Sequence, residues 1–239
     1  MSSLLRGDFH VHSTFSDDAV STITENIAAA AAVDLLELRL VDHVRRDTSW
    51  VPEFTAAVAA ERVPDGLTLL TGVEAKILDS TGTMDVPPAL TGVDAVLIAD
   101  HQFPGVGEPW SPREARERLE SGLSAPDALE LLVSGLIGAM ANVAAMPGVE
   151  RGQLAHCFSI LPKVGLSEDD LSDEHLAAWA AAAAGTRTLV EVNEKWGCPG
   201  PRALRAALSA GVELVASTDS HVASDVGRYD RVATILDEL

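Results

Sequence analysis

Histidines and carboxylates gather in this sequence at the ends of apolar runs. Six of the seven histidines lie at or just after such a run, each beside or near an Asp or Glu. Clear examples are the segments DFHVH at 8–12 and DSH at 219–221. Imidazole nitrogens and carboxylate oxygens are common ligands of zinc, manganese and iron. This distribution predicts one metal site assembled from distant parts of the chain.

Clustered divalent ions would suit the hydrolysis of phosphate esters. Phosphate monoesters are dianionic and resist attack by water, so a catalyst must supply positive charge and a deprotonated water. A water between two ions has a lowered pKa and becomes a metal-activated hydroxide, while a third ion and nearby cations neutralise the transferring oxygens. These ligand types do not select among zinc, manganese and iron.

Length, charge and cysteine usage narrow the class of protein. With 239 residues, 47% of them hydrophobic, the chain can bury one large core. A net charge of -19 argues against long nucleic acids and anionic membranes. The apolar stretch Leu129–Met146 is interpreted as a buried helix, and no signal peptide is recognised. With only Cys157 and Cys198 present, we expect a cytoplasmic protein without a membrane partner; its oligomeric state stays open.

Short apolar runs alternate with alanine-rich segments of helical periodicity. Seven runs are apolar nearly throughout, as expected of parallel strands covered on both faces. They are Leu5–His10, Leu35–Asp42, Leu67–Lys76, Ala95–His101, Gly152–Phe158, Thr188–Asn193 and Val212–Thr218. Helices are predicted at Thr24–Ala32, Glu53–Ala60, Pro112–Ser121, Pro126–Met146, Asp173–Ala184, Pro201–Ala210 and Ala233–Leu239. Ser111 and Ser172 are suitable N-caps for two of them.

This alternation predicts an α/β fold. Strand, helix, strand units pair in parallel through right-handed crossovers, and seven of them favour a closed or nearly closed barrel over a doubly wound open sheet. No linker or repeat divides residues 1–239, so we expect a single domain with a helical insertion at about residues 102–148. The carboxyl ends of barrel strands converge on one mouth, which would bring the strand-end histidines together.

Nine residues at the predicted mouth are candidate metal ligands. They are His10, His12, Asp17, His43, Glu74, His101, His156, Asp219 and His221. Each position alone has an ordinary structural explanation, because a lone histidine at a strand end is more often a packing residue. Their coincidence at six of the seven strand ends favours a shared site. His175 lies inside a predicted helix, and we expect it at the surface.

The ligand segments resemble the polymerase and histidinol phosphatase (PHP) family. The resemblance extends from residue 8 to residue 221 and includes DFHVHS at 8–13, SD at 16–17, VDH at 41–43, GVE at 72–74, ADH at 99–101, AH at 155–156 and STDSH at 217–221. It implies a distorted (β/α)7 TIM-like barrel, a cluster of three divalent metal ions and hydrolysis of phosphate esters.

The resemblance also implies how the ligands divide. His10, His12, Glu74 and Asp219 would hold one ion; Glu74, His101 and His156 a second; Asp17, His43 and His221 a third. Glu74 would bridge the first two ions, and we expect Glu74, Asp219 and His221 to be the catalytic residues.

Three positions depart from the family's usual pattern without removing a ligand. Asp18 replaces a common glycine and adds negative charge near the third ion, Val41 replaces a threonine, and Cys157 replaces a proline. Asp42 and Asp100 each precede a candidate ligand histidine. Their carboxylates could orient a metal ligand by accepting a hydrogen bond from it.

Cations on the mouth-side loops are candidate ligands for the phosphate oxygens. These are Arg45, Arg46, Lys195 and Arg228. Arginine can engage two oxygens at once, although loop arginines in so acidic a chain are often surface ion pairs. Trp196, Trp50 and Trp110 are candidates for stacking on a leaving group or for covering the core.

The sequence therefore predicts a metal-dependent phosphoesterase that hydrolyses a small phosphorylated metabolite, with histidinol phosphate as one candidate substrate. A nucleotide phosphodiesterase or exonuclease would use the same metals. A metal-binding module without catalysis is the alternative from a different class of protein.

Overall fold

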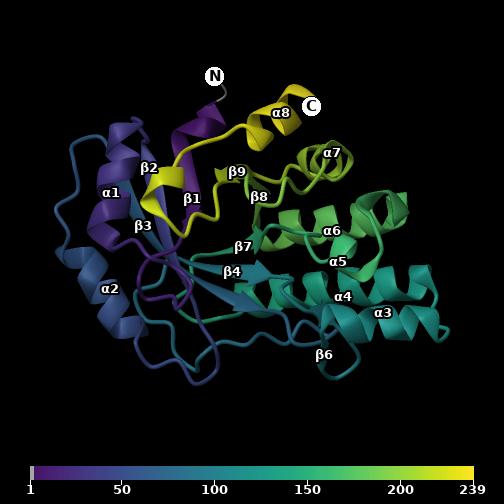
Figure 1. Ribbon diagram of the computed structural model, residues 1–239. Coiled ribbons are helices and arrows are strands. Elements are labelled where there is room, and N and C mark those ends of the chain that lie inside the picture. Colours follow the sequence, from purple (N-terminus) through teal and green to yellow (C-terminus); the bar gives the residue numbers. More distant parts are fainter. Residues whose placement is uncertain (1–2) are drawn as a thin grey trace.

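The computed structural model describes residues 3–239, and its centre is a parallel sheet of seven strands (Figure 1). The strand order is β1-β2-β3-β4-β7-β8-β9. The strands are β1 Gly7–Val11, β2 Glu37–His43, β3 Thr68–Lys76, β4 Ala95–Ala99, β7 Arg151–Ala155, β8 Leu189–Asn193 and β9 Leu214–Ser217. All seven predicted strands are confirmed, with shifted ends.

Contacts between β1 and β9 bring the two edges of the sheet together. Val11 forms a parallel bridge with Ser220, and the His12 N–H donates to the Ser220 carbonyl at 2.8 Å. The Asp8 carboxylate accepts hydrogen bonds from the backbone N–H groups of Thr218 and Gly227, at 2.9 and 3.0 Å. The Asp8 side chain thus supplies hydrogen bonds between β1 and β9, the two edge strands, which are not paired by a regular backbone ladder. The result is a nearly closed, distorted TIM-like barrel rather than an open sheet.

Helices surround the sheet, with α1 and α2 on one side and α3 to α6 on the other (Figure 1). The helices are α1 Ile23–Ala32, α2 Val51–Ala60, α3 Pro112–Glu120, α4 Ala125–Ala144, α5 Leu161–Val164, α6 Asp173–Thr186, α7 Pro201–Ser209 and α8 Arg231–Asp237. Short 3-10 helices occupy Ser3–Arg6, Glu168–Asp170 and Ala223–Asp225. The predicted caps at Ser111 and Ser172 are confirmed, each accepting from a backbone N–H three residues later.

The segment between β4 and β7 contains α3, α4 and a small hairpin that was not predicted. The hairpin pairs β5 Phe103–Pro104 with β6 Pro109–Trp110. By length and composition α4 could cross a membrane. However, it packs against α6, β4 and β7 and buries Leu129, Leu132 and Leu136. Burial in the core therefore accounts for its apolar character.

The barrel interior differs from the core between sheet and helices. A small cluster of Val41, Ala95, Leu97, Ala99 and Ala155 lies apart from the two larger apolar clusters. Successive strand residues face opposite sides of a sheet, so these alternate positions share the inner face. Buried polar side chains also occupy the interior, namely Arg39, Gln153 and Glu191. The interior thus provides hydrogen-bonding groups directly beneath the strand ends.

Candidate metal centre

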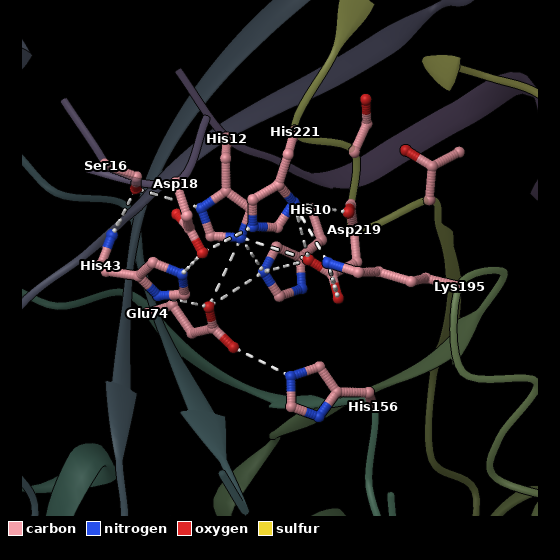
Figure 2. Close-up of polar contacts among 12 residues, drawn as sticks. His10, His12, Ser16, Asp18, His43, Glu74, His156, Lys195, Asp219 and His221 are labelled. Carbon is pink, nitrogen blue, oxygen red and sulfur yellow. Dashed lines mark hydrogen bonds and ion pairs between the residues drawn. The ribbon is translucent and has the colours of Figure 1, made fainter. Parts of the chain in front are cut away.

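Eight of the nine predicted ligands come together where the strands end, and Figure 2 labels all of these except His101. They are His10, His12, His43, Glu74, His101, His156, Asp219 and His221. The ninth, Asp17, is exposed on the loop after β1. It lines the same cavity of about 470 Å³, but makes no hydrogen bond or ion pair within residues 3–239.

Glu74 is the centre of this arrangement. Its Oε2 lies 2.9 Å from His43 Nδ1 and 3.4 Å from His10 Nε2. Its Oε1 lies 3.1 Å from His101 Nε2 and 3.0 Å from His156 Nε2. Although burial opposes ionisation, His101 and His10 hold the pKa of Glu74 well below its ordinary value. The residue is an anionic bridge between histidines that come from different strands.

Glu191 orients His10. Its carboxylate lies 3.1 and 3.3 Å from His10 Nδ1, and Gln153 and Asn193 donate to it at 2.7 and 2.8 Å. A proton on Nδ1 that faces Glu191 leaves Nε2 directed at Glu74. Despite burial, Glu191 and Glu74 hold the pKa of His10 well above its ordinary value. No role was predicted for Glu191 from the sequence.

His156 is oriented by Asp100. The Asp100 Oδ1 lies 3.4 Å from His156 Nδ1, and Ser159 Oγ donates to the same oxygen at 2.8 Å. Although burial lowers it, hydrogen bonds to Asp100 and Glu74 raise the pKa of His156 to about 10. Asp100 therefore acts on a histidine of another strand rather than on the His101 that follows it in the sequence.

His12 is positioned through Ser16 and Asp42. His12 Nδ1 lies 3.3 Å from Ser16 Oγ, and that hydroxyl donates to Asp42 Oδ1 at 2.6 Å. Asp42 Oδ2 also accepts from the Ser13 hydroxyl at 2.6 Å. Burial lowers the pKa of His12 to about 3, so its imidazole is neutral and Nε2 can act as a ligand.

Asp219 connects the histidines with Lys195 and Trp196. Its Oδ1 lies 3.3 Å from His12 Nε2, while its Oδ2 accepts from Trp196 Nε1 at 2.9 Å and lies 3.4 Å from Lys195 Nζ. Asp219 has a φ of 52°, uncommon for a residue with a side chain. Burial opposes its ionisation, but His12 and His10 lower its pKa strongly. It is an ionised acceptor in this site.

The outer part of the centre is formed by His43, His221 and Asp18. Asp18 Oδ2 lies 3.4 Å from His43 Nε2 and 3.2 Å from His221 Nε2. Although partial burial opposes ionisation, the charges of His43 and His221 together lower the pKa of Asp18 below its ordinary value. The structure therefore brings Asp18, rather than the predicted Asp17, to the histidines of the third ligand group.

The donor set fits divalent metal ions. Three groups have ligand atoms within 4.8 Å of one another: His10, His12 and Asp219; His43, Glu74 and His101; His12, His43 and His221. Glu74 Oε2 is buried, and the imidazole nitrogens of His43, His10 and His12 lie 2.9, 3.4 and 3.5 Å from it. Two imidazole nitrogens, His10 Nε2 and His12 Nε2, face each other at 3.0 Å. A cation between such atoms would take the place of the proton that the two imidazoles share and would be bound by both nitrogens.

The candidate phosphate-binding cations differ in their placement. Lys195 and Arg45 line the cavity of the metal centre, and Lys195 Nζ lies 3.2 Å from His221 Nδ1. Arg228 lines an adjoining cavity of about 350 Å³ together with Lys195 and His221. Arg46 lines neither cavity. Lys76, which was not predicted as a phosphate-binding residue, also lines the metal-centre cavity.

The three candidate tryptophans differ in whether they lie at the metal centre or in the core. Trp196 lines the metal-centre cavity and donates to Asp219. Trp50 packs against Phe15 and Trp110 against Phe103, with ring centres 5.4 and 5.7 Å apart. Those two cover parts of the core, whereas Trp196 belongs to the site.

Comparisons with known proteins agree on one family. The model of the PHP domain matches residues 8–195. A protein of Acetivibrio thermocellus described as a probable phosphatase is 26% identical over 235 residues, covering 97% of this chain and 86% of its own length. A probable phosphatase of Enterobacter sp. is 26% identical over 244 residues, covering 97% and 85%.

A solved structure shares the fold. It is the histidinol phosphate phosphatase of Lactococcus lactis subsp. lactis, complexed with zinc, L-histidinol and phosphate. Its TM-score is 0.64 at 16% identity, with coverage of 97% of this chain and 91% of that chain. At this identity the likeness concerns the fold.

Proposed function

This chain belongs to the PHP domain family, and on that premise we propose that it is a metal-dependent phosphoesterase that hydrolyses a small phosphate monoester. The observation that carries the proposal is the position of Glu74, whose two oxygens face histidines from the ends of four other strand segments. A buried anion with that many imidazoles suits a cluster of ions better than it suits packing alone.

The ligand groups assign residues to three divalent ions. His10, His12, Glu74 and Asp219 would hold one, and Glu74, His101 and His156 a second. His43 and His221 would hold the third with a carboxylate from the loop after β1, and the contacts of Asp18 favour it over Asp17. Zinc, manganese and iron all accept these ligands.

Such ions would neutralise the dianionic phosphate and lower the pKa of a nearby water, as phosphate-ester hydrolysis requires. The protein's own residues account for binding and orientation. Lys195 and Arg45 line the cavity and can contact phosphate oxygens. Asp219 accepts from Trp196 and pairs with Lys195, so it fixes the ammonium group beside His221.

Histidinol phosphate is one candidate substrate. The support is the shared fold with a histidinol phosphate phosphatase, together with the family membership. Against a long nucleic-acid substrate stands the net charge of -19, since polyanion binding depends on clustered cations. The net charge argues less strongly against a small nucleotide, which carries few phosphates. Nucleotides are therefore included as substrates in the activity test.

The proposal is tested by reconstituting the protein with zinc, manganese or iron(II) and supplying a panel of phosphate monoesters, nucleotides and phosphodiesters. We expect release of inorganic phosphate from at least one monoester and its abolition by a chelator. Hydrolysis confined to diesters or oligonucleotides would instead support the phosphodiesterase alternative. Metal-dependent stabilisation without any turnover would support a binding module.

A further inference from the structure

A buried arginine lies in the barrel interior beneath the metal centre. Arg39 is on β2, two residues before Val41 of the interior cluster, so both side chains point into the barrel. Arg39 is only 5% exposed, and its stem passes over Gly72, where an added Cβ would lie 3.2 Å from Arg39 Cδ. Burial lowers the pKa of Arg39 to about 10, although the charge of Asp94 opposes this. The guanidinium is therefore charged at neutral pH.

This guanidinium has no direct counter-ion. Within residues 3–239, no carboxylate forms an ion pair with it. Its Nη1 donates to Gln153 Oε1, and its Cζ lies 5.1 Å from the centre of the Phe9 ring. A buried charge without a counter-ion is costly, and an arginine side chain is long and flexible. Arg39 would therefore pair with a buried carboxylate if one came within reach.

Such a carboxylate lies on the other side of Gln153. The Gln153 Nε2 donates to Glu191 Oε2 at 2.7 Å and to the Phe9 carbonyl at 3.1 Å. The same Glu191 oxygen lies 3.1 Å from His10 Nδ1. A continuous chain of contacts thus runs from Arg39 through Gln153 and Glu191 to a histidine of the metal centre.

The partners of Gln153 fix the orientation of its amide. A guanidinium can only donate hydrogen bonds, whereas carboxylates and carbonyls can only accept them. The amide oxygen must therefore face Arg39, and the NH2 group must face Glu191 and the Phe9 carbonyl. In this position a neutral amide separates a buried cation from a buried anion, two groups that attract each other strongly in a medium of low dielectric constant.

We propose that Gln153 is a positioning residue of the metal centre, because it keeps the Arg39 guanidinium from pairing with Glu191 and so leaves that carboxylate on His10. The inference rests on the proposed function only in taking His10 as a metal ligand. A direct pair between Arg39 and Glu191 would draw the carboxylate away from His10 Nδ1. The imidazole would then lose the contact that directs its Nε2 at the metal.

The test measures zinc affinity by chelator competition in four proteins: the wild type, Gln153→Ala, Arg39→Met and the double variant. In Gln153→Ala we expect the affinity to fall about ten- to a hundredfold, because the guanidinium can then reach Glu191. In Arg39→Met it should change by no more than a few-fold, since Gln153 keeps its contacts with Glu191 and Phe9. The double variant should return to within a few-fold of Arg39→Met, because no competing cation remains.

This recovery distinguishes positioning from packing. If Gln153 acted only by filling space, removing a second buried side chain beside it would increase the defect. Wild-type affinity in Gln153→Ala, or a double variant as weak as Gln153→Ala, would overturn the proposal. Gln153→Ser, whose side chain is also too short to separate the two charges, replaces the alanine variant if that protein does not fold.

Asn142→Ala is the matched control. The Asn142 amide donates to the Gly82 carbonyl at 2.9 Å, on α4 outside the barrel. The variant loses an amide hydrogen bond without touching the chain of contacts below the metal centre. We expect its zinc affinity to equal that of the wild type. A fall as large as that of Gln153→Ala would show that the effect is not specific to Gln153, and would contradict the proposal.

A crystal structure of Gln153→Ala without metal separates this inference from the proposed function. We expect the Arg39 guanidinium within hydrogen-bond distance of Glu191, and the carboxylate displaced from His10 Nδ1. A guanidinium in its original position, with Glu191 still on His10, would contradict the proposal whatever the metal content. If the wild type bound no zinc, the proposed function would fail, and this structure would still decide whether Gln153 holds the two charges apart.

Discussion

The metal centre has a buried side and an exposed side. The buried side consists of His10, His12, Glu74 and His156, whose side chains are no more than 1% exposed. The exposed side consists of His43, His101 and His221, whose side chains are 26%, 34% and 19% exposed. Asp18, at 53%, lies at its outer edge.

The two sides also differ in how their histidines are held. On the buried side, Glu191, Ser16 and Asp100 each contact the ring nitrogen that points away from the centre. On the exposed side, His43 and His221 share one half-exposed carboxylate, that of Asp18. The buried side is therefore organised by the fold before any ion arrives, whereas the exposed side can adjust to ions and substrate.

Glu74→Ala should have the largest effect, because Glu74 contacts histidines of both sides. We expect loss of bound metal and a fall in kcat/KM of about a thousandfold or more, since Lewis-acid stabilisation contributes several kcal/mol. Elemental analysis alongside kinetics checks this expectation. Metal content and activity like those of the wild type would remove Glu74 from its bridging role.

Glu191→Gln tests the organisation of the buried side. Four groups direct hydrogen bonds at Glu191, from His10, Gln153, His156 and Asn193. An amide NH2 at this position would face donors, so His10 should lose its orientation. We expect metal affinity to fall about ten- to a hundredfold.

The control for this variant is Glu194→Gln, just beyond the same strand. Within residues 3–239, the Glu194 carboxylate accepts hydrogen bonds only from the backbone N–H groups of Arg231 and Val232 at the start of α8. Metal titration of both variants should show a large change for Glu191→Gln and little for Glu194→Gln. Equal affinities would show that Glu191 does not orient His10.

Metal affinity should rise with pH. Without metal, the pKa of His156 is about 10 and that of His10 is also raised, so both imidazoles carry a second proton near neutral pH. A metal ion must displace these protons, and binding therefore strengthens as pH increases towards 10. Chelator competition should show a gain of roughly tenfold per pH unit for each displaced proton. A pH-independent affinity would show that metal binding displaces no proton from His10 or His156, and would contradict their raised pKa values.

Smaller effects are expected on the exposed side. Asp18→Asn removes the carboxylate that contacts His43 and His221, and should weaken one of the bound ions by a few-fold up to about tenfold. Asp17→Asn should change little, because Asp17 has no contact with these histidines. The reverse order would support Asp17, the ligand predicted from the sequence. A metal titration that resolves the weakly bound ion from the tightly bound ions would show which of the two variants loses affinity.

Local patterns explain why the sequence predicted the seven strands and the convergence of the ligands. Apolar runs such as Ala95–Ala99 are buried throughout, and a barrel brings their carboxyl ends together. The hairpin at Phe103–Trp110 was missed because strands of two residues carry no periodicity. The role of Glu191 was missed because its partner, His10, is 181 residues away in the sequence. The two residues meet only because the barrel brings their strands together.

The sequence also could not show whether Asp17 or Asp18 contacts the outer histidines. Both are carboxylates on one loop, and side-chain direction there depends on contacts with His43 and His221. The sequence pattern could therefore identify the loop but not the residue that faces the histidines.

A crystal structure of the protein with zinc and phosphate, recorded with anomalous scattering, tests the central claim most directly. We expect peaks in the three ligand groups, with Glu74 bridging two ions at about 2.0–2.2 Å from its oxygens, and phosphate within reach of Lys195. Zinc bound elsewhere, or histidines still in direct contact with Glu74 and no ion between them at saturating zinc, would contradict it.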